Sequence, residues 1–279
     1  MAIVSISRGS NSRGAEVAEK AARLLGYRCL ARESIVEAAG LYNLSSEELV
    51  QAIEHPPSIL ERTLDSKARY LTTIRAALLH QFSTDDVVYH GFEGHYFVRD
   101  IEHALNIRIL ADLSDRVAAL MEREQIPESV AHQQLLKMDQ ARRRWGLYLY
   151  GADPEDPSLY DLVLHVGKMG TDGAAEVIFN LAHPGEFQST EESRAKLHDL
   201  ALAASTRAAL MELRLDLAIV DIAAHAGVVR ISFHEPNFSR TSSSSEFREQ
   251  YLERLERRVR ERTQEIPGLK QIKLEHRDD

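Results

Sequence analysis

The N-terminal segment constrains the fold of this chain more than any other. A short β-branched run over residues 2–6 precedes a polar turn with Gly9 and Gly14, and residues 13–25 then place apolar side chains at helical spacing. Such a strand–loop–helix unit is typical of phosphate binding, because backbone N–H groups of the loop and of the helix N-terminus converge on one anion. The segment therefore predicts an α/β protein with a phosphate-binding loop.

The loop keeps the spacing of that motif but lacks two of its chemical groups. The usual signature is G-x-x-x-x-G-K-[ST], in which the lysine contacts phosphate and the hydroxyl contacts magnesium. Here Ala15 stands at the lysine position and Glu16 at the hydroxyl position. Glu16 is either a magnesium ligand or, as we favour, a carboxylate stabilised by the helix N-terminus.

Length and composition exclude several classes of protein. The 279 residues can form one large domain or two smaller ones, and the single cysteine, Cys29, excludes a disulfide framework and a cysteine-rich metal site. Without a signal peptide or an apolar run of about 18 residues, we expect a cytoplasmic protein that does not enter a membrane. The net charge of −9 argues against general nucleic-acid binding, whereas the basic residues 137–144 suit a small polyanion or a solvated helix face.

The rest of the chain predicts two units. Strands are expected at residues 27–30, 87–90, 107–111 and 162–166, and helices at 32–40, 59–82, 114–124, from Pro127 onward and at 173–182. This alternation favours a parallel sheet flanked by helices over residues 1–182. Residues 183–194 are interpreted as a linker. Residues 195–279 predict a small α+β domain, with a helix over 195–213, a hairpin of 218–222 and 228–232, a helix over 246–265 and a strand over 269–274.

An ordered series of short motifs carries a family resemblance. The motifs are Ile6-Ser7-Arg8, Leu25-Gly26-Tyr27, Arg32-Glu33-Ser34-Ile35, residues 94–100, Met121-Glu122-Arg123-Glu124, Lys137-Met138-Asp139 with Arg142 and Arg143, and Tyr160-Asp161-Leu162. Over most of residues 1–182 the chain thus resembles the cytidylate-kinase-like family of P-loop proteins. The C-terminal unit more weakly resembles a BON domain, through residues 227–232 and 266–270, although its Ser-rich insertion departs from that pattern.

The resemblance implies phosphoryl transfer from a nucleoside triphosphate, ATP with Mg²⁺, to a (d)CMP-like nucleoside monophosphate. The residues it assigns to nucleotide binding are Arg8, Gly9, Ser10, Asn11, Ser12, Arg13, Gly14, Ala15 and Glu16. Lys137, Arg142 and Arg143 correspond to a mobile lid over the reacting phosphates, and Asp139 orients one of its arginines. Arg32 lies where the acceptor-binding segment begins.

The residues that depart from the family pattern lie where the family binds the reacting phosphates and the acceptor. They are the residues that replace family glycines or charged groups: Asn11, Arg13, Ala15, Ala31 and Phe92. Each lost charge removes several kcal/mol of transition-state stabilisation, roughly a 10²–10³-fold effect on rate. Arg13 is a candidate for the missing cation, with Arg8 as the second.

Three functions therefore remain open from the sequence. The first is a nucleoside monophosphate kinase-like enzyme with a relocated cation. The second is a nucleotide-binding regulatory module with little or no turnover, whose C-terminal domain signals to a protein or small-molecule partner. The third is an interaction protein that binds no nucleotide, and an oligomer is compatible with all three.

Other side chains that could bind a metal or stack on a base have simpler interpretations. His90, His95 and His165 lack the spacing of a zinc site, and we interpret them as structural histidines. Trp145, Tyr148 and Tyr150 follow the basic residues and either stack on a base or, as we favour, pack a helix end into the core. We predict no metal site built from protein ligands alone.

Overall fold

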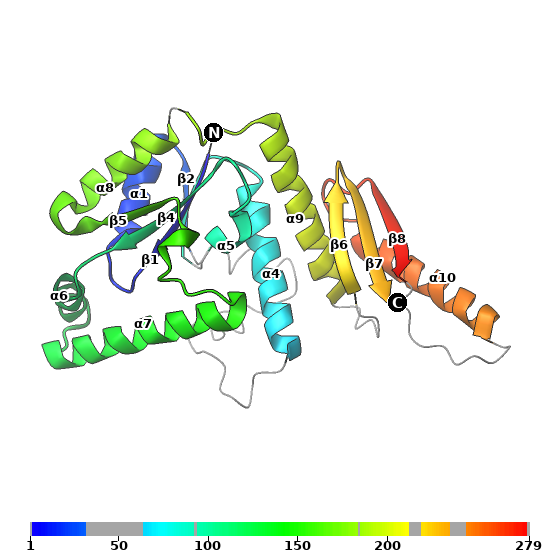
Figure 1. Ribbon diagram of the computed structural model, residues 1–279, viewed down its shortest axis with the longest axis horizontal. Helices are drawn as coiled ribbons and strands as arrows, with labels where there is room; N and C mark the ends of the chain where they lie inside the picture. Colours follow the sequence, from blue (N-terminus) through cyan, green and yellow to red (C-terminus); the bar gives the residue numbers. More distant parts are fainter. Residues whose placement is uncertain are drawn as a thin grey trace.

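The computed structural model describes residues 2–31, 64–91, 94–183, 185–211, 219–234 and 244–277. The helix expected over residues 32–40, the predicted acceptor residue Arg32, and Phe92 lie outside these ranges. Two units are visible, each with its own sheet, and helix α9 (Glu191–Met211) runs between them (Figure 1).

The N-terminal unit contains a parallel sheet with the strand order β2-β3-β1-β4-β5. The strands are β1 (Ile3–Arg8), β2 (Arg28–Leu30), β3 (Val87–His90), β4 (Ala104–Leu110) and β5 (Leu162–His165). The central strands β1 and β3 are almost wholly buried, as expected for a parallel sheet covered on both faces. The predicted parallel sheet with flanking helices is confirmed.

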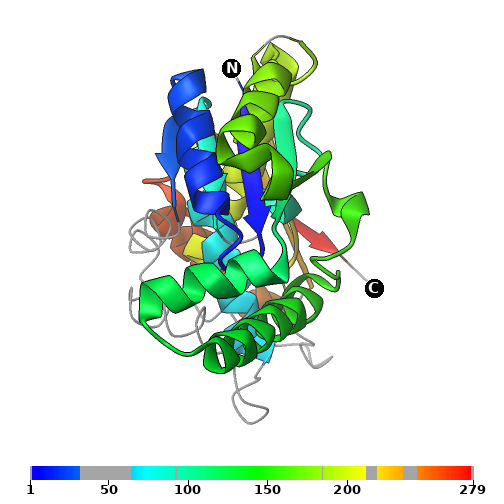
Figure 2. The same cartoon turned by 90° about the vertical axis from the view of Figure 1, so that its left-hand side faces the viewer.

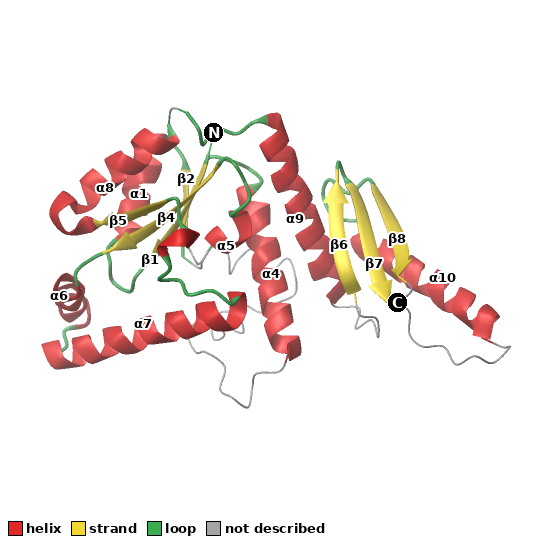
Figure 3. Ribbon diagram, viewed as in Figure 1, coloured by secondary structure: helices red, strands yellow, loops and turns green. Residues whose placement is uncertain are grey.

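Helices cover both faces of this sheet (Figures 1 and 3). The helices of the unit are α1 (Gly14–Leu25), α4 (Leu64–Phe82), α5 (His95–Val98), α6 (Leu113–Glu124), α7 (Glu128–Tyr150) and α8 (Val166–Ala182), with a short 3₁₀ turn at Pro157–Leu159. Helices α1 and α8 share one core with the sheet, and α4, α5 and α9 share the other. Helices α6 and α7 lie across the end of the sheet toward which β1 points (Figure 2).

Helix α1 begins and ends as its sequence predicts. Its apolar residues Val17, Ala18 and Ala21 are buried, because they recur on the side that faces the sheet. Gly26 ends the helix in the left-handed conformation, with φ of 71°, so the predicted C-terminal cap is confirmed. The helix therefore fixes the loop at residues 9–13 against a rigid element.

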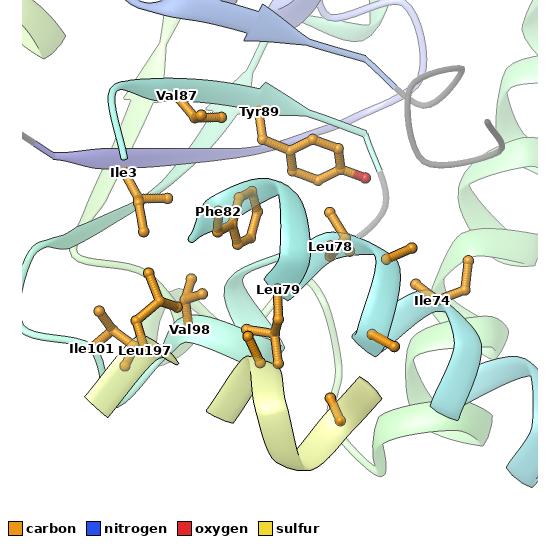
Figure 4. Packing of buried hydrophobic residues seen from close by; sticks show 14 of the residues in the cluster. Ile3, Ile74, Leu78, Leu79, Phe82, Val87, Tyr89, Val98, Ile101 and Leu197 are labelled. Carbon is orange, nitrogen blue, oxygen red and sulfur yellow. The ribbon is translucent and has the colours of Figure 1, made fainter. Parts of the chain in front are cut away.

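The core on the α4 side is built from large side chains of α4 and the sheet (Figure 4). Phe82 contacts Tyr89 edge to face, with ring centroids 5.6 Å apart. Leu197 of α9 reaches the same cluster, beside Val98 and Ile101. Helix α9 is thus part of the N-terminal core although it follows the predicted linker.

The C-terminal unit has the predicted order of helix, hairpin, helix and strand. Strands β6 (Ile219–His225) and β7 (Val228–His234) pair antiparallel, and β8 (Gln271–Arg277) pairs parallel with β7 after helix α10 (Ser244–Thr263). Leu202 and Leu210 of α9 join the core of this unit. Helix α9 therefore packs on both units.

Helix α9 begins inside the segment that the sequence assigned to a linker. The Thr190 N–H donates to Ser193 Oγ at 2.9 Å, and the Ser193 N–H donates to Thr190 Oγ1 at 3.0 Å. These reciprocal bonds satisfy N–H groups at the start of the helix. The domain boundary proposed from the sequence stays a prediction.

Within the described ranges, none of the helices combines the length and the apolar character needed to cross a membrane.

Candidate functional site

A cavity of about 240 Å³ lies between the loop at residues 9–13, strand β4 and helices α6 and α7. It sits at the carboxyl ends of β1 and β4, where parallel sheets usually bind ligands. Five arginines line it, namely Arg8, Arg108, Arg116, Arg142 and Arg143, together with the carboxylates of Asp139 and Glu155. The cavity is therefore suited to an anion with several charges.

The loop has the backbone shape of an anion-binding turn without the usual glycines. Asn11 and Arg13 both adopt left-handed conformations, with φ of 55° and 59°. Ser12 closes the turn, since its N–H donates to Gly9 O at 3.3 Å and its Oγ donates to the same oxygen at 3.0 Å. Left-handed backbone costs a residue with a side chain about 1–2 kcal/mol, although asparagine tolerates it better than most. The fold therefore holds two residues with side chains in left-handed backbone, at positions where the resemblance leads us to expect glycine.

Gly14 is required by the side chain of Arg8. A Cβ atom on Gly14 would lie 2.7 Å from Arg8 Cβ and 2.9 Å from Arg8 Cδ. The stem of Arg8 thus crosses the first turn of α1. At Gly9 an added Cβ would meet the guanidinium carbon of Arg116 at 3.8 Å, an ordinary contact. Two arginines from different elements therefore lie against the two loop glycines.

Arg116 is the most firmly held cation beside the loop. Its Nε donates to Ser10 O at 2.7 Å, and its Nη2 lies 2.6 Å from Asp139 Oδ2. Only 13% of its side chain is exposed. The sequence predicted that Asp139 orients an arginine of the α7 lid, but the arginine it contacts is on α6.

Sequence reasoning missed Arg116. It lies in the first turn of α6, directly after strand β4, and it is not part of a basic segment, because the next arginine of this helix of mixed charge is Arg123. Its position after a central strand was the available signal, because that end of the sheet faces the loop. Arg123, farther along α6, donates to Asn11 Oδ1 at 2.9 Å. Helix α6 therefore contacts the loop at two points.

The predicted lid residues on α7 separate into two groups. Arg142 and Arg143 line the cavity. Arg142 Nη1 donates to Arg8 O at 2.5 Å, and Arg143 Nη2 lies 2.6 Å from Asp153 Oδ2. Lys137 is exposed on the same helix and is not among the described residues that line the cavity. The structure thus brings Asp139, Arg142 and Arg143 together with the loop.

Arg13 and Glu16 pair with each other outside the cavity. Arg13 Nη2 lies 2.9 Å from Glu16 Oε2, Lys20 lies 3.1 Å from Glu16 Oε1, and Thr171 Oγ1 donates to the same oxygen at 2.8 Å. Desolvation would raise the pKa of Glu16, but the hydrogen bonds from Thr171, Lys20 and Arg13 outweigh it and lower that pKa to about 2. Glu16 is thus an ionised carboxylate in the first turn of α1, as expected, but side-chain contacts with Thr171, Lys20 and Arg13 stabilise its charge, and the stabilisation by the helix N-terminus stays a prediction.

The β4 side of the cavity joins polar and aromatic groups. Tyr160 OH donates to Pro154 O at 2.8 Å and lies 3.1 Å from Ser7 Oγ. Arg108 Nη1 donates to Ser7 Oγ at 3.5 Å and to Tyr160 OH at 3.4 Å. These contacts fix Arg108 on the β4 side of the cavity.

His95 packs against Tyr160 on the β4 side of the cavity and is neutral. Burial, followed by the charges of Arg108 and Arg99, lowers the pKa of His95 to about 3. Its ring lies 4.1 Å from that of Tyr96 and 4.7 Å from that of Tyr160. Neither ring nitrogen has a hydrogen-bond partner within the described part of the chain, so ring packing alone holds this histidine.

The aromatic residues after the basic segment pack as the favoured interpretation has it. Trp145, Tyr148 and Tyr150 all lie against the core on the α4 side. Tyr150 also stacks on Tyr96, with ring centroids 4.1 Å apart. Trp145 additionally lines the cavity, so a bound base would meet its side chain.

Comparison with known proteins adds relatives to this geometry. The sequence model of the cytidylate kinase-like family matches residues 3–168, more than half of the chain. A cytidylate kinase of Desulfurococcus amylolyticus is 28% identical over 162 residues, which are 58% of this chain and 82% of the relative.

Solved structures are similar in fold. An uncharacterized protein from Eubacterium ventriosum matches with a TM-score of 0.52 and 20% identity, over 65% of this chain and 97% of that chain. A shikimate kinase from Bacteroides thetaiotaomicron matches more distantly, with a TM-score of 0.42 and 8% identity, over 66% of this chain and 99% of that chain. The first likeness shows the fold alone.

Proposed function

Because the chain belongs to the cytidylate kinase-like family, we propose that its arginine-lined cavity binds a nucleoside triphosphate, ATP in the first instance. The terminal phosphoryl group is then transferred to a (d)CMP-like nucleoside monophosphate. The observation that carries the proposal is the gathering of five arginines from β1, β4, α6 and α7 around the loop at the end of the sheet.

This arrangement suits phosphoryl transfer because that reaction asks a protein for positioning and positive charge. The bond between the β,γ-bridging oxygen and the γ-phosphorus breaks, and a bond from an acceptor phosphate oxygen forms. Negative charge accumulates on the oxygens in between. Guanidinium groups bind such oxygens in pairs, and Arg116, already oriented by Asp139, loses little conformational freedom in doing so.

The proposed roles follow the geometry. The loop amides at the start of α1 hold donor phosphates, with Arg8 and Arg116 beside them. Arg142 and Arg143 approach from α7 as the cations of the lid. Arg32 as acceptor residue and Lys137 as lid residue stay predictions.

Magnesium, which the family implies, does not fit the residues at the loop. A magnesium ion needs oxygen ligands in octahedral arrangement. The position of the usual hydroxyl holds Glu16, whose carboxylate is bonded to Arg13, Lys20 and Thr171. We therefore derive no step through the metal.

A second function is favoured by a specific observation. Helix α9 packs on the N-terminal core through Leu197 and on the C-terminal core through Leu202 and Leu210. A rigid helix shared by two units can pass a change in one unit to the other. With Ala15 at the lysine position, the alternative is a regulatory module of low turnover, whose BON-like C-terminal unit binds a protein or small-molecule partner.

A nucleotide panel tests both functions. Thermal unfolding of the full chain is followed with mono-, di- and triphosphates, and ADP formation from ATP is measured with CMP and with dCMP. Enzyme function predicts stabilisation by ATP and acceptor-dependent ADP formation, which Arg142→Ala abolishes and the control Arg144→Ala, on the exposed side of the same helix, retains. Stabilisation without turnover supports the regulatory module, and no stabilisation at millimolar nucleotide refutes both.

A further inference from the structure

We propose that this cavity binds the metal-free nucleoside triphosphate, with arginines taking the place of both the loop lysine and the magnesium ion. The inference rests on the proposed nucleotide binding and deepens it, because it specifies the charged form of the ligand. Three features of the site carry it.

The first feature is the state of the loop side chains. Ala15 offers no polar group, and Glu16 directs its oxygens to Arg13, Lys20 and Thr171. The Ser12 hydroxyl donates to Gly9 O within the loop itself. The loop therefore offers backbone N–H groups to a phosphate, while the side-chain oxygens of Ser12 and Glu16 have partners of their own and the buried Ser10 Oγ has none among the described residues.

The second feature is the state of the carboxylates at the cavity. Asp139 lies 2.6 Å from Arg116, and Glu155 lies 3.8 Å from Arg143, which also pairs with Asp153 at 2.6 Å. Each of these carboxylates is thus paired with an arginine. Over the described residues, no group of three or more histidine, cysteine, aspartate and glutamate side chains is arranged to hold a metal ion. Asp139 or Glu155 could therefore coordinate magnesium only by giving up its contact with an arginine.

The third feature is the balance of charge. The described residues that line the cavity include five arginines and two carboxylates, which give this lining an excess of positive charge. A magnesium ion placed among them would be repelled, since like charges destabilise each other strongly where water is scarce. The metal-free triphosphate carries more negative charge than its magnesium complex, in which the metal cancels part of that charge. The cavity therefore favours the metal-free form.

Arg116 is the cation on which this preference depends most. It lies over Gly9, it is largely buried, and it reaches the loop through Ser10 O. A phosphate held by the loop amides would meet its guanidinium group, whose five N–H donors include three beside those bound to Ser10 O and Asp139. Arg116 thus joins the loop, through Ser10 O, to a carboxylate of α7, Asp139.

Titration calorimetry of the full chain with ATP tests the inference. Affinity is measured in EDTA and in excess MgCl₂, with ionic strength matched by NaCl, for the wild type, Arg116→Gln and the control Arg144→Gln. We expect ATP to bind as tightly in EDTA as in MgCl₂, or more tightly. We expect Arg116→Gln to weaken binding at least tenfold in EDTA, and the control to leave it unchanged.

The outcomes separate the inference from the function on which it rests. Binding that is more than threefold weaker in EDTA than in MgCl₂ overturns metal-free recognition and leaves nucleotide binding intact. Equal loss of affinity in Arg116→Gln and in Arg144→Gln overturns the role of Arg116. Absence of ATP binding in both buffers overturns the proposed function and the inference together.

Discussion

The loop at residues 9–16 and the wall formed by α6 and α7 face each other across the same cavity and differ in where they keep charge. The loop keeps the glycine spacing of a phosphate-binding motif but has Ala15 and Glu16 at the lysine and hydroxyl positions. The wall contributes Arg116, Arg142 and Arg143. The comparison supports our proposal that α6 supplies the cation that the loop lacks, because electrostatic attraction depends on distance and burial and not on which element carries the charge.

Arg13 and Arg116 show this difference in single residues. Arg13 belongs to the loop, but 54% of its side chain is exposed and its charge is paired with Glu16. Arg116 comes from α6, and only 13% of its side chain is exposed. Water screens the first charge strongly and the second weakly, so Arg116 is the better replacement for the missing lysine.

The largest expected effect follows from removing Arg116. Hydrogen bonds to a charged partner contribute about 1.5–3 kcal/mol, so Arg116→Gln is expected to weaken ATP binding by roughly 10–100-fold. Calorimetric titration of ATP measures the change. Asp139→Asn is the companion variant, because it keeps the shape of the partner and removes its charge, and it is expected to weaken binding less than Arg116→Gln does.

A contrary result would reverse the comparison between loop and wall. If Arg116→Gln bound ATP within threefold of the wild type, and circular dichroism showed an intact fold, the wall would not supply the cation. We would then expect Arg8→Gln to cause the larger loss of ATP affinity, because the aliphatic part of the Arg8 side chain crosses the start of α1.

The second effect concerns the loop glycines and is on stability. Gly14→Ala places a Cβ atom 2.7 Å from Arg8 Cβ, and relief of such a contact is expected to reduce the free energy of unfolding by roughly 1–2 kcal/mol. Gly9→Ala is the matched control, since its nearest contacts are at 3.8 Å. Urea denaturation measures both variants. Equal stability of the two would show that Arg8 can leave the first turn of α1 without loss.

The fold was largely predictable from the sequence because its signals are local. Residues 87–90 read as a strand from their β-branched and aromatic run, and Gly26 marked the end of α1. The start of α9 was not predicted, because Thr190 and Ser193 are typical both of a linker and of a helix cap. Only the bonds between their own side chains and backbone distinguish the two.

Site residues were predictable where basic residues follow one another in the sequence, but not where a basic residue stands alone. Arg142 and Arg143 stood out as part of a basic segment, and the structure places both at the cavity. Arg116 had no such signal, since its position depends on β4 lying beside β1, which brings the start of α6 to the loop. That neighbourhood is a property of strand order, which motifs near one residue do not encode.

The third effect is a pH dependence of stability that belongs to the loop. The pKa of folded Glu16 is about 2, below its ordinary value of 4.5, so the ionised carboxylate stabilises the fold above pH 4.5 and this contribution is lost as the pH falls toward 2. Because 38% of the side chain is exposed, the contribution is at most about 1 kcal/mol. Urea denaturation between pH 2 and 6 should show the wild type losing more stability on acidification than Glu16→Gln.

Thr171→Val tests the source of that dependence. It removes the hydroxyl that donates to Glu16 Oε1 at 2.8 Å and accepts from Lys20 Nζ at 2.9 Å, while Arg13 and Lys20 keep their ion pairs with Glu16. The acid-dependent loss of stability should shrink in this variant but remain measurable. An unchanged profile would mean that the two cations alone hold the pKa of Glu16 down.

The smallest expected effect is that of Arg13, and it separates the loop from the wall most directly. Arg13→Gln removes an exposed charge that is paired with Glu16, and exposed pairs contribute only about 0–1 kcal/mol. We therefore expect ATP affinity within about twofold of the wild type, measured in the same titration as Arg116→Gln. A tenfold loss would mean that Arg13 leaves Glu16 and turns toward the phosphates when nucleotide binds. Arg13, two residues before Ala15, would then replace the missing lysine, and Arg116 of α6 would only support the loop.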